Sequence, residues 1–410
     1  MAADPTVPHV PDPTCYPLPD GPLPDGPAPV VTTLRVAFLL EQAWHRVPGG
    51  TAVAAVESAR ALVARHDVDL VGLTARHRTD DLPPLLAPSV DGSDPGPASP
   101  PILQLVGSRL PRPLLYEAWH RGRRPRVDRM AGQPDVVHAS GGAVPATRAP
   151  LVATVHDLAW RRHPEAATRR GHRMFEGWLA DARRADRVVC PSEATRRELV
   201  DAGFDGDRIR VVPLGVALVV VEQGLPQRLR VRYGLDGPFV LWVGTLEPRK
   251  NLSRLVAAMS APGPLADVPL VLVGPRGWRT DVAETVAPLG DRAVVVGSVD
   301  EVEKRAWYEA ADVFCLPSLH EGFGLPVLEA MAHGTPVVTS SGTATEEVVG
   351  DGGLLVDPLE SGAIGEALVA VLGDAALSTR LGAAGRIRAG AHPWSRTADG
   401  LVATYREVVG

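Results

Sequence analysis

Residues 313–331 of this 410-residue chain read Val-Phe-Cys-Leu-Pro-Ser-Leu-His-Glu-Gly-Phe-Gly-Leu-Pro-Val-Leu-Glu-Ala-Met. The apolar start predicts a buried strand over Val313–Leu316 that ends at the following proline. Gly322 and Gly324 break the loop that follows, and Pro326 suits the first turn of a helix. A strand, a loop and a helix in this order form the repeating unit of a doubly wound sheet.

Two carboxylates flank this helix start. Glu321 falls in the loop at the carboxyl end of the strand, and Glu329 falls about one turn into the helix. The helix start at Gly324-Leu325 offers free N–H groups and a partial positive charge, which favour a phosphate. Together these groups suit a nucleotide sugar: one carboxylate for sugar hydroxyls, the helix for phosphates, the other carboxylate for the ribose. The alternatives are a solvated loop acid at Glu321 and simple charge complementarity at Glu329.

A second loop brings two cations to the same kind of position. Residues 243–252, Val-Gly-Thr-Leu-Glu-Pro-Arg-Lys-Asn-Leu, follow a predicted strand, and we expect Asn251 to cap the next helix. Arg249 and Lys250 would form a diphosphate site without a metal. A solvated basic pair is the alternative, although positive charge at a helix start is mildly unfavourable. No Asp-x-Asp pair lies beside a cleft strand, so we predict no metal and no cofactor.

Two weaker signals lie in the first half of the chain. Gly49-Gly50-Thr51 stands at a strand-to-helix junction, where Gly50 lets the backbone approach a ligand, but a plain tight turn explains it equally well. His156 follows the strand predicted over 151–155 and could bind a sugar hydroxyl or be a satisfied structural histidine. No Gly-x-Gly-x-x-Gly fingerprint occurs.

Short apolar runs alternate with helical segments along the whole chain. We predict strands over 34–40, 68–73, 102–106, 136–138, 151–155 and 187–190, and then a restart with strands over 239–243, 270–273, 293–296, 313–316 and 336–339. Apolar strands separated by helices indicate parallel sheets that are covered on both faces. We therefore predict an α/β chain of two doubly wound, Rossmann-like domains facing across a cleft, with ligands at the carboxyl ends of the strands.

The remaining composition limits the environment of the protein. Residues 1–33 are rich in Pro, Asp and Gly and predict a disordered tail, or a start codon assigned too early; residues 81–101 predict a surface loop. Three cysteines are too few for a disulfide framework and predict buried thiols. The apolar runs are too short for a membrane-spanning helix and no secretory signal is recognisable, so we expect a cytoplasmic protein.

The net charge of −6 is unevenly distributed. Residues 34–214 contain 26 Arg, no Lys and 21 acidic residues, a net of +5, whereas residues 215–410 contain 14 Arg, two Lys and 23 acidic residues, a net of −7. The basic half suggests an anionic acceptor or a peripheral membrane surface, or else a solvated surface rich in arginine. The arginines are not interleaved with stacking aromatics, so nucleic acid is not indicated.

At these residues the chain resembles the retaining glycosyltransferases of family 4, which have the GT-B fold. Glu321 and Glu329 match the Glu-x7-Glu signature of the family, and the segment 243–252 resembles its pyrophosphate loop. Residues 334–338 and 189–199 resemble two further family segments, and Trp394-Ser395 resembles the start of a last helix that crosses back to the first domain. The resemblance runs from about residue 34 to the C-terminus.

The resemblance implies a role for each candidate residue. Glu321 would contact hydroxyls of the transferred sugar and support the oxocarbenium ion, with His156 near that sugar. Glu329 would bind the ribose. The donor phosphates would lie against a set of residues from both domains: Gly50, Thr245, Arg249, Lys250, Gly324 and Leu325. Many members carry Arg where this chain has Thr245, so more of the phosphate binding falls to Arg249 and Lys250.

The resemblance also implies the reaction. Family members use no metal, and the departing phosphate helps to deprotonate the acceptor on the same face. The pattern Thr-x-Glu-Pro-Arg-Lys-Asn looks most like the mannosyltransferase branch, so GDP-mannose is the expected donor. The acceptor would be a glycan, a lipid-linked or a small molecule of cell-envelope polysaccharide synthesis, met at the inner face of the membrane. The expected domains are acceptor-side over 34–214, donor-binding over 215–393 and a returning helix over 394–410.

Three other functions remain open at this point. A related GT-B enzyme could use a UDP-sugar, as a transferase or an epimerase, or act as a phosphorylase. A nicotinamide-dependent oxidoreductase shares the doubly wound architecture, but the missing glycine fingerprint counts against it. A catalytically silent binding protein is the third, and the intact carboxylates and cations argue against that.

Overall fold

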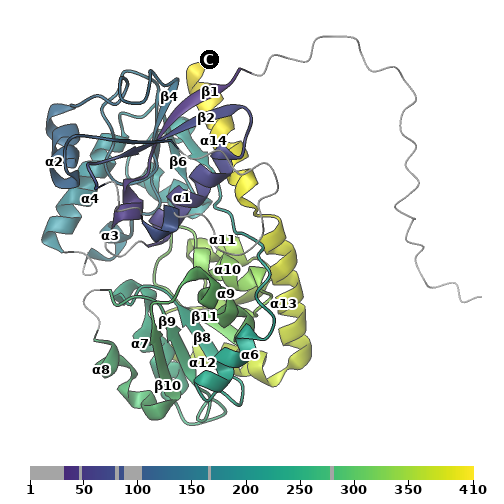
Figure 1. Cartoon of the computed structure of the whole chain (residues 1–410). Helices are drawn as coiled ribbons and strands as arrows, with labels where there is room; N and C mark the ends of the chain where they lie inside the picture. The colour runs from purple at the N-terminus through teal and green to yellow at the C-terminus, as the bar shows by residue number, and fades with distance from the viewer. Residues whose placement is uncertain (1–31, 46–48, 79–82, 87–103, 165–167, 278–280) are drawn as a thin grey trace, which may run out of the picture. The chain divides into compact units, whose positions relative to one another are not determined.

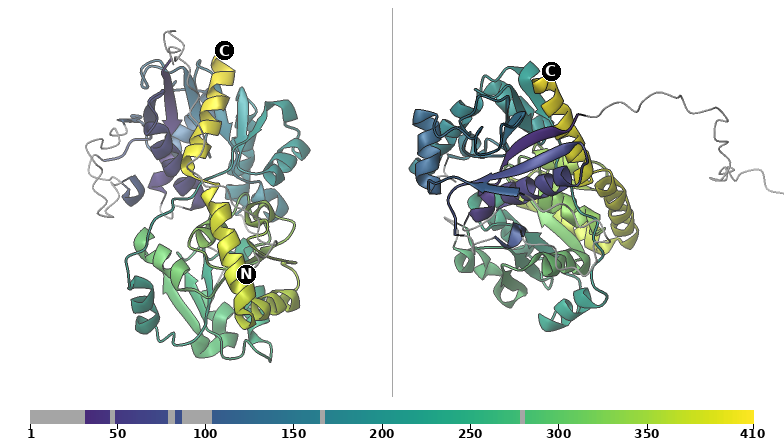
Figure 2. Two further views of the ribbon diagram at one scale, coloured as in Figure 1. Left: turned by 90° about the vertical axis from the view of Figure 1, so that its right-hand side faces the viewer. Right: turned by 45° about the horizontal axis from the view of Figure 1, so that its top comes forward.

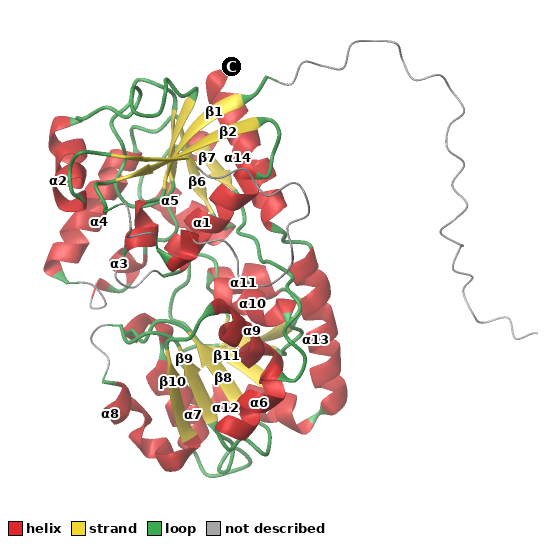
Figure 3. Cartoon of the chain, in the orientation of Figure 1, coloured by secondary structure: helices red, strands yellow, loops and turns green. Residues whose placement is uncertain are grey.

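The computed structural model describes residues 32–45, 49–78, 83–86, 104–164, 168–277 and 281–410 (Figure 1). These residues build two sheets with only parallel neighbours, one of seven strands in the order β3-β2-β1-β4-β5-β6-β7 and one of six in the order β10-β9-β8-β11-β12-β13. Helices cover both sheets, as Figure 3 shows. The α/β prediction with two doubly wound sheets is therefore confirmed.

Strands and helices alternate over most of the chain. The strands are β1 Leu34–Leu39, β2 Val68–Thr74, β3 Gln104–Gly107, β4 Val136–Ala139, β5 Leu151–Thr154, β6 Arg187–Cys190, β7 Ile209–Val211, β8 Val240–Val243, β9 Leu270–Val273, β10 Ala293–Gly297, β11 Val313–Leu316, β12 Val337–Ser340 and β13 Gly353–Val356. The helices are α1 Gly50–Val63, α2 Arg112–Glu117, α3 Ala159–Arg162, α4 Arg169–Ala182, α5 Glu193–Asp201, α6 Leu225–Arg232, α7 Leu252–Ser260, α8 Val282–Val286, α9 Glu301–Ala310, α10 Leu325–Ala332, α11 Ala344–Val349, α12 Ser361–Gly373, α13 Ala375–Gly390 and α14 Trp394–Val409.

Successive residues of β1 point to opposite faces of the first sheet. Val36 and Phe38 belong to a core that also holds residues of α1 and α14, whereas Ala37 and Leu39 belong to a second core on the other face. A strand that is covered on both faces has to be apolar at nearly every position. This requirement explains why the strands read as continuous apolar runs rather than alternating ones.

Each sheet has one point where the winding direction reverses. β1 lies between β2 and β4, and β8 lies between β9 and β11. The chain leaves β1 toward one side and returns to the other side at β4, and the second sheet repeats this at β8 and β11. Ligands of doubly wound sheets bind outside the carboxyl ends of the strands at such points. We therefore expect the ligand site at the loops after β1, β8 and β11.

The last helix, at the yellow end of the chain in Figure 2, packs on the first sheet. Leu401 and Tyr405 of α14 are buried in the core beside β1. Arg406 Nη2 donates to Asp67 Oδ2 at 2.7 Å, and Glu407 pairs with Arg210 at 2.7 Å. The predicted return of the C-terminal helix to the first domain is confirmed.

The predicted strands differ from the observed ones by one or two residues at several ends, for example at β8 and β12. β7 and β13 were not predicted: both are short edge strands of three and four residues. The tail predicted over 1–33 and most of the loop predicted over 81–101 lie outside the described residues, and the predicted domain boundaries stay predictions. No single helix in the described ranges is long and apolar enough to cross a membrane; α12 and α13 meet the length and composition requirements only as a pair, which is bent by 99°.

Candidate functional site

The loop between β11 and α10 carries the first glutamate. Gly324 stands before α10 with a φ of +104°, and a Cβ there would lie 2.7 Å from Thr345 Cγ2. The position therefore requires glycine. Pro326 lies in the first turn of α10 as expected. Glu321 lies in the loop and Glu329 in the helix, as the sequence predicts.

Glu321 is buried between two cations. Lys250 Nζ donates to Oε1 at 2.6 Å, and Arg249 Nη1 donates to Oε2 at 3.0 Å. Burial alone would raise the pKa of Glu321, but the charges of Lys250 and Arg249 outweigh burial and lower the pKa to about 2. The carboxylate is therefore ionised at neutral pH. The alternatives of a solvated loop acid and a solvated basic pair are wrong, since Glu321 and Lys250 are only 7% exposed.

A short 3₁₀ helix, Pro248–Lys250, positions both cations. Arg249 Nη1 also donates to the carbonyl oxygen of His320 at 2.7 Å, and its Nη2 donates to Glu247 Oε1 at 2.6 Å. These contacts join the loop after β8 to the loop after β11, across the reversal point of the second sheet. Lys250 Nζ has three N–H donors. Within the described part of the chain Glu321 is its only acceptor, so donors remain for a ligand.

Asn251 does not cap α7 as predicted. Its φ is +57°, and its Nδ2 donates to the carbonyl oxygens of Pro317 at 2.8 Å and Pro358 at 2.7 Å. The amide thus satisfies two carbonyl groups of other loops instead of an N–H of its own helix. Those loops come close to Asn251 only in the folded sheet, so local sequence could not indicate this use.

Two helix N-termini meet at the same place. Gly50 is the first residue of α1, and a Cβ on it would lie 3.8 Å from Cδ1 of Leu325, the first residue of α10. Each N-terminus presents unpaired N–H groups and a partial positive charge. Thr245 follows β8, half-buried, and adds no charge. The arrangement suits an anion between α1 and α10.

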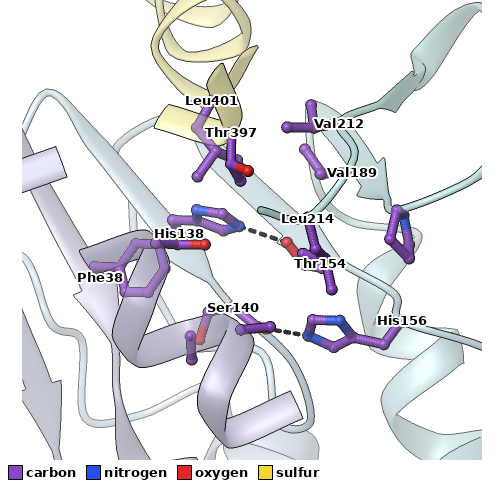
Figure 4. A pocket seen from close by; sticks show the side chains of 14 residues that line it. Phe38, His138, Ser140, Thr154, His156, Val189, Val212, Leu214, Thr397 and Leu401 are labelled. Atoms are coloured by element: carbon purple, nitrogen blue, oxygen red, sulfur yellow. Dashed lines mark hydrogen bonds between the residues drawn. The ribbon is translucent and has the colours of Figure 1, made fainter. Parts of the chain in front are cut away.

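Figure 4 shows His156 with its ring directed toward Ser140. The Nε2 atom lies 2.8 Å from the carbonyl oxygen of Ser140, which can only accept, so Nε2 carries the proton. Burial lowers the pKa of His156, so the ring is neutral at pH 7 and Nδ1 is an acceptor. His156 can therefore accept a hydrogen bond from a hydroxyl, and it is not placed to donate a proton. The nearby His138 is saturated by Tyr405 and Thr154 and is structural.

Glu329 has its own partners on α9. Lys304 Nζ donates to Oε1 at 3.0 Å, and Tyr308 OH donates to Oε2 at 2.8 Å. The structure thus brings Arg249, Lys250 and Glu321 together, and it keeps Glu329 in a separate cluster. Neither Lys304 nor Tyr308 was predicted. The one available signal was that Lys304 is the second of only two lysines in the chain.

Sequence reasoning also missed the contact that holds the Glu321 loop to the first sheet. A Cβ on Gly322 would overlap the carbonyl oxygen of His156 and lie 2.8 Å from Asp157 Cβ. Ser192 Oγ donates to the carbonyl oxygen of Gly322 at 2.8 Å, and Thr195 Oγ1 lies 3.2 Å from it. Gly322 therefore allows the loop of Glu321 to touch the loop of His156.

No group of three or more His, Cys, Asp or Glu side chains that could hold a metal occurs within the residues that the structure describes. Cys190 and Cys315 are buried free thiols, as predicted, and Cys15 lies outside the described residues.

Comparison with known proteins agrees with this geometry. Residues 237–374 match the family described as glycosyl transferases group 1, and residues 48–219 match glycosyltransferase family 4. The chain is 30% identical over 310 residues to an O-antigen chain mannosyltransferase B of Escherichia coli, covering 72% of this chain and 81% of the relative. It is 35% identical over 400 residues to a D-inositol 3-phosphate glycosyltransferase of Acidothermus cellulolyticus, covering 88% and 86%.

A sucrose-phosphate synthase from Thermosynechococcus elongatus has a similar structure, with a TM-score of 0.70 at 24% identity over 91% of this chain and 98% of that one. This likeness shows the fold alone. From the family matches and the two relatives, the chain belongs to glycosyltransferase family 4 and is a GT-B enzyme that transfers a sugar from a nucleotide-sugar donor.

Proposed function

We propose that this enzyme is a retaining, metal-independent hexosyltransferase that uses GDP-mannose. The observation that carries the proposal is the ionised Glu321 between Lys250 and Arg249, at the carboxyl ends of β8 and β11. A carboxylate that is hydrogen-bonded to two cations can stabilise the charges that develop on both sides of a glycosyl–phosphate bond as it breaks. The cations stabilise the leaving diphosphate, and the carboxylate stabilises the positive charge that develops on the sugar.

The donor would lie with its diphosphate between the N-termini of α1 and α10. Gly50, Gly324 and Leu325 bring backbone there, and Lys250 retains free N–H donors in the described structure. Burial lowers the pKa of Arg249, but Glu321 and Glu247 outweigh it and raise the pKa, so the guanidinium keeps its charge. The two cations would neutralise the diphosphate as negative charge accumulates during bond cleavage.

The sugar would lie between Glu321 and His156, which the contact of Gly322 with His156 brings to one place. Glu321 would accept sugar hydroxyls, and His156 Nδ1 would accept one more. With Nδ1 of His156 used by the sugar hydroxyl, the departing phosphate oxygen would be the base that takes the proton of the acceptor hydroxyl. Attack from that same face retains the anomeric configuration.

The choice of mannose rests on the Thr-x-Glu-Pro-Arg-Lys-Asn pattern and on the relative named an O-antigen chain mannosyltransferase. The other relative is named for D-inositol 3-phosphate. Together with the net positive charge of residues 34–214, this name supports an acceptor that carries phosphate, on a glycan, a lipid or a small polyol.

The test is donor turnover with GDP-mannose, UDP-glucose and UDP-N-acetylglucosamine, with and without excess EDTA. We expect GDP release from GDP-mannose only, unchanged by EDTA, and an α-mannosyl product by NMR. Loss of turnover in EDTA with recovery in Mn²⁺ would contradict the phosphate site. UDP and N-acetylmannosamine formed without an acceptor would identify an epimerase instead.

We also propose that the enzyme is cytoplasmic and binds the inner membrane face peripherally. Exposed arginines gather on α4 and on the neighbouring turn, which His120 links to α4 through Asp181 at 2.6 Å. The exposed arginines include Arg121, Arg123, Arg124, Arg169, Arg170 and Arg173. Each arginine near an anionic surface contributes ~1 kcal/mol to binding. Replacing Arg169, Arg170 and Arg173 by Ser should release the protein from anionic vesicles in a sedimentation assay; unchanged binding would contradict this site.

A further inference from the structure

The carboxylate of Glu329 accepts hydrogen bonds from two side chains of the neighbouring helix α9. Lys304 Nζ and Tyr308 OH donate to its two different oxygens, at 3.0 and 2.8 Å. Lys304 and Tyr308 are four residues apart on α9, so they lie on the same face of that helix. Turning the Glu329 carboxylate out of its present plane would therefore weaken both hydrogen bonds.

The surroundings of Tyr308 favour a hydrogen bond from its hydroxyl to Glu329. Its side chain is completely buried and stacks parallel to His333, with ring centroids 6.1 Å apart. Burial and the nearby carboxylate of Glu329 raise the pKa of Tyr308 well above its usual value, so the hydroxyl keeps its proton. Among the described residues Glu329 is the only partner of that hydroxyl. The buried hydrogen bond therefore has a single geometry.

Lys304 supplies the opposing charge. Burial lowers the pKa of Lys304, but Glu329 and Glu301 outweigh burial and raise it, so the ammonium stays charged. The pair with Glu301 is 3.0 Å long. The ammonium keeps Glu329 from repelling an anionic ligand that binds nearby.

The hydrogen bonds from Lys304 and Tyr308 occupy only half of the acceptor positions of Glu329. A carboxylate has about four lone-pair positions, two on each oxygen, and Lys304 and Tyr308 take one on each. One position therefore remains on each oxygen, and the side chain is 19% exposed, so a ligand can reach it. Two remaining acceptor positions, one on each oxygen, match the number of hydroxyls in a ribose diol.

We propose that Tyr308, together with Lys304, is a positioning pair that holds Glu329 in the one orientation that accepts both ribose hydroxyls of the donor. The pair would thus select ribonucleotide over deoxyribonucleotide donors. The inference rests on the proposed function, because it requires the donor ribose to bind at Glu329.

The test is calorimetric binding of GDP and 2′-deoxy-GDP, with UDP and 2′-deoxy-UDP in parallel, to the wild type and to Tyr308→Phe. We expect the wild type to prefer the ribonucleotide about tenfold, the effect of one well-made hydrogen bond to a charged group. Tyr308→Phe keeps the ring and should reduce this preference to about twofold, since Glu329 then rotates. Tyr405→Phe is the matched control: Tyr405 is equally buried, with its hydroxyl 2.6 Å from His138 Nδ1 and no contact with Glu329.

Tyr405→Phe should keep the full tenfold preference even where it lowers the melting temperature. Lys304→Met, a second variant at a partly exposed position, should also reduce the preference. If the wild type binds ribo- and deoxynucleotides equally, the assignment of Glu329 to the ribose is overturned and this inference falls with it. If the wild type discriminates and both Tyr308→Phe and Lys304→Met discriminate as well, the positioning role alone is overturned.

Discussion

Glu321 and Glu329 stand eight residues apart, and each is paired with one of the only two lysines of the chain. Glu321 is 7% exposed, and its partners Lys250 and Arg249 come from a loop 71 and 72 residues away along the chain. The side chain of Glu329 is 19% exposed, and its partner Lys304 comes from the preceding helix.

A bound donor would affect the Glu321–Lys250 pair and the Glu329–Lys304 pair differently. The proposed diphosphate would need Lys250 and Arg249 themselves, so it would have to share them with Glu321. The proposed ribose would need only the open lone pairs of Glu329, so it would bind without disturbing Lys304. In the proposed function Glu321, Lys250 and Arg249 (the Glu321 cluster) would thus be coupled to the reacting bond, whereas Glu329, Lys304 and Tyr308 (the Glu329 cluster) would be a fixed recognition surface.

The largest effect should come from the glutamates themselves. Glu321→Gln should lower kcat by ~10²–10³, because the ionised carboxylate acts on charge that develops in the transition state. Affinity for GDP should rise, since Lys250 and Arg249 lose their internal anion. Glu329→Gln should instead raise the donor KM, with a small change in kcat. Steady-state kinetics and calorimetry of both variants test this. If Glu321→Gln raises the donor KM and Glu329→Gln lowers kcat, the roles assigned to the two glutamates are reversed.

Replacing the two lysines should likewise affect different kinetic parameters. Lys250→Met should lower turnover about 10²-fold, because it removes a charge that faces the leaving diphosphate. Lys304→Met is the matched change, and it should act on the donor KM while kcat stays within about tenfold. Equal kcat losses in the two variants would show that the clusters are not functionally distinct.

Gly322→Ala tests whether the Glu321 cluster depends on contact with the first sheet. The added Cβ would meet the backbone of His156, and the loop has to move away. A displacement of about 1 Å can cost up to ~10²-fold in rate, so we expect a loss of kcat of roughly 10- to 100-fold. Gly362→Ala in α12 is the control, because a Cβ there meets nothing within 4 Å. If Gly322→Ala has wild-type kinetics, the site does not depend on the contact between the loop of Glu321 and the loop of His156.

The smallest effect is on stability at acid pH. The pKa of Glu321 lies at about 2 in the folded enzyme, below its ordinary value of 4.5. A carboxyl group with a depressed pKa stabilises the fold above 4.5 and loses this contribution as the pH falls toward 2. Between pH 7 and pH 4 the wild type should lose ~1 kcal/mol more than Glu321→Gln. Urea unfolding at both pH values measures this, and parallel losses would show that Glu321 is not the titrating group.

The sequence alone determined the order of elements and the position of most loops that carry the site. Apolar runs such as 240–243 and 313–316 have to be buried on both faces, and Pro326 and Gly324 mark where a helix starts, because these effects depend on neighbours a few residues away. Parallel strands place their carboxyl ends together, so the order of residues along the chain is enough to assign Lys250 and Glu321 to one edge of the sheet.

Only the tertiary structure decided which groups meet. That Lys250 neutralises Glu321, that Tyr308 holds Glu329 and that Gly322 touches His156 depends on strand order and on helix packing. The error at Asn251 has the same origin: its amide serves carbonyl groups 66 and 107 residues away. Contacts over such separations are set by the global fold, and no local propensity or period in the sequence encodes them.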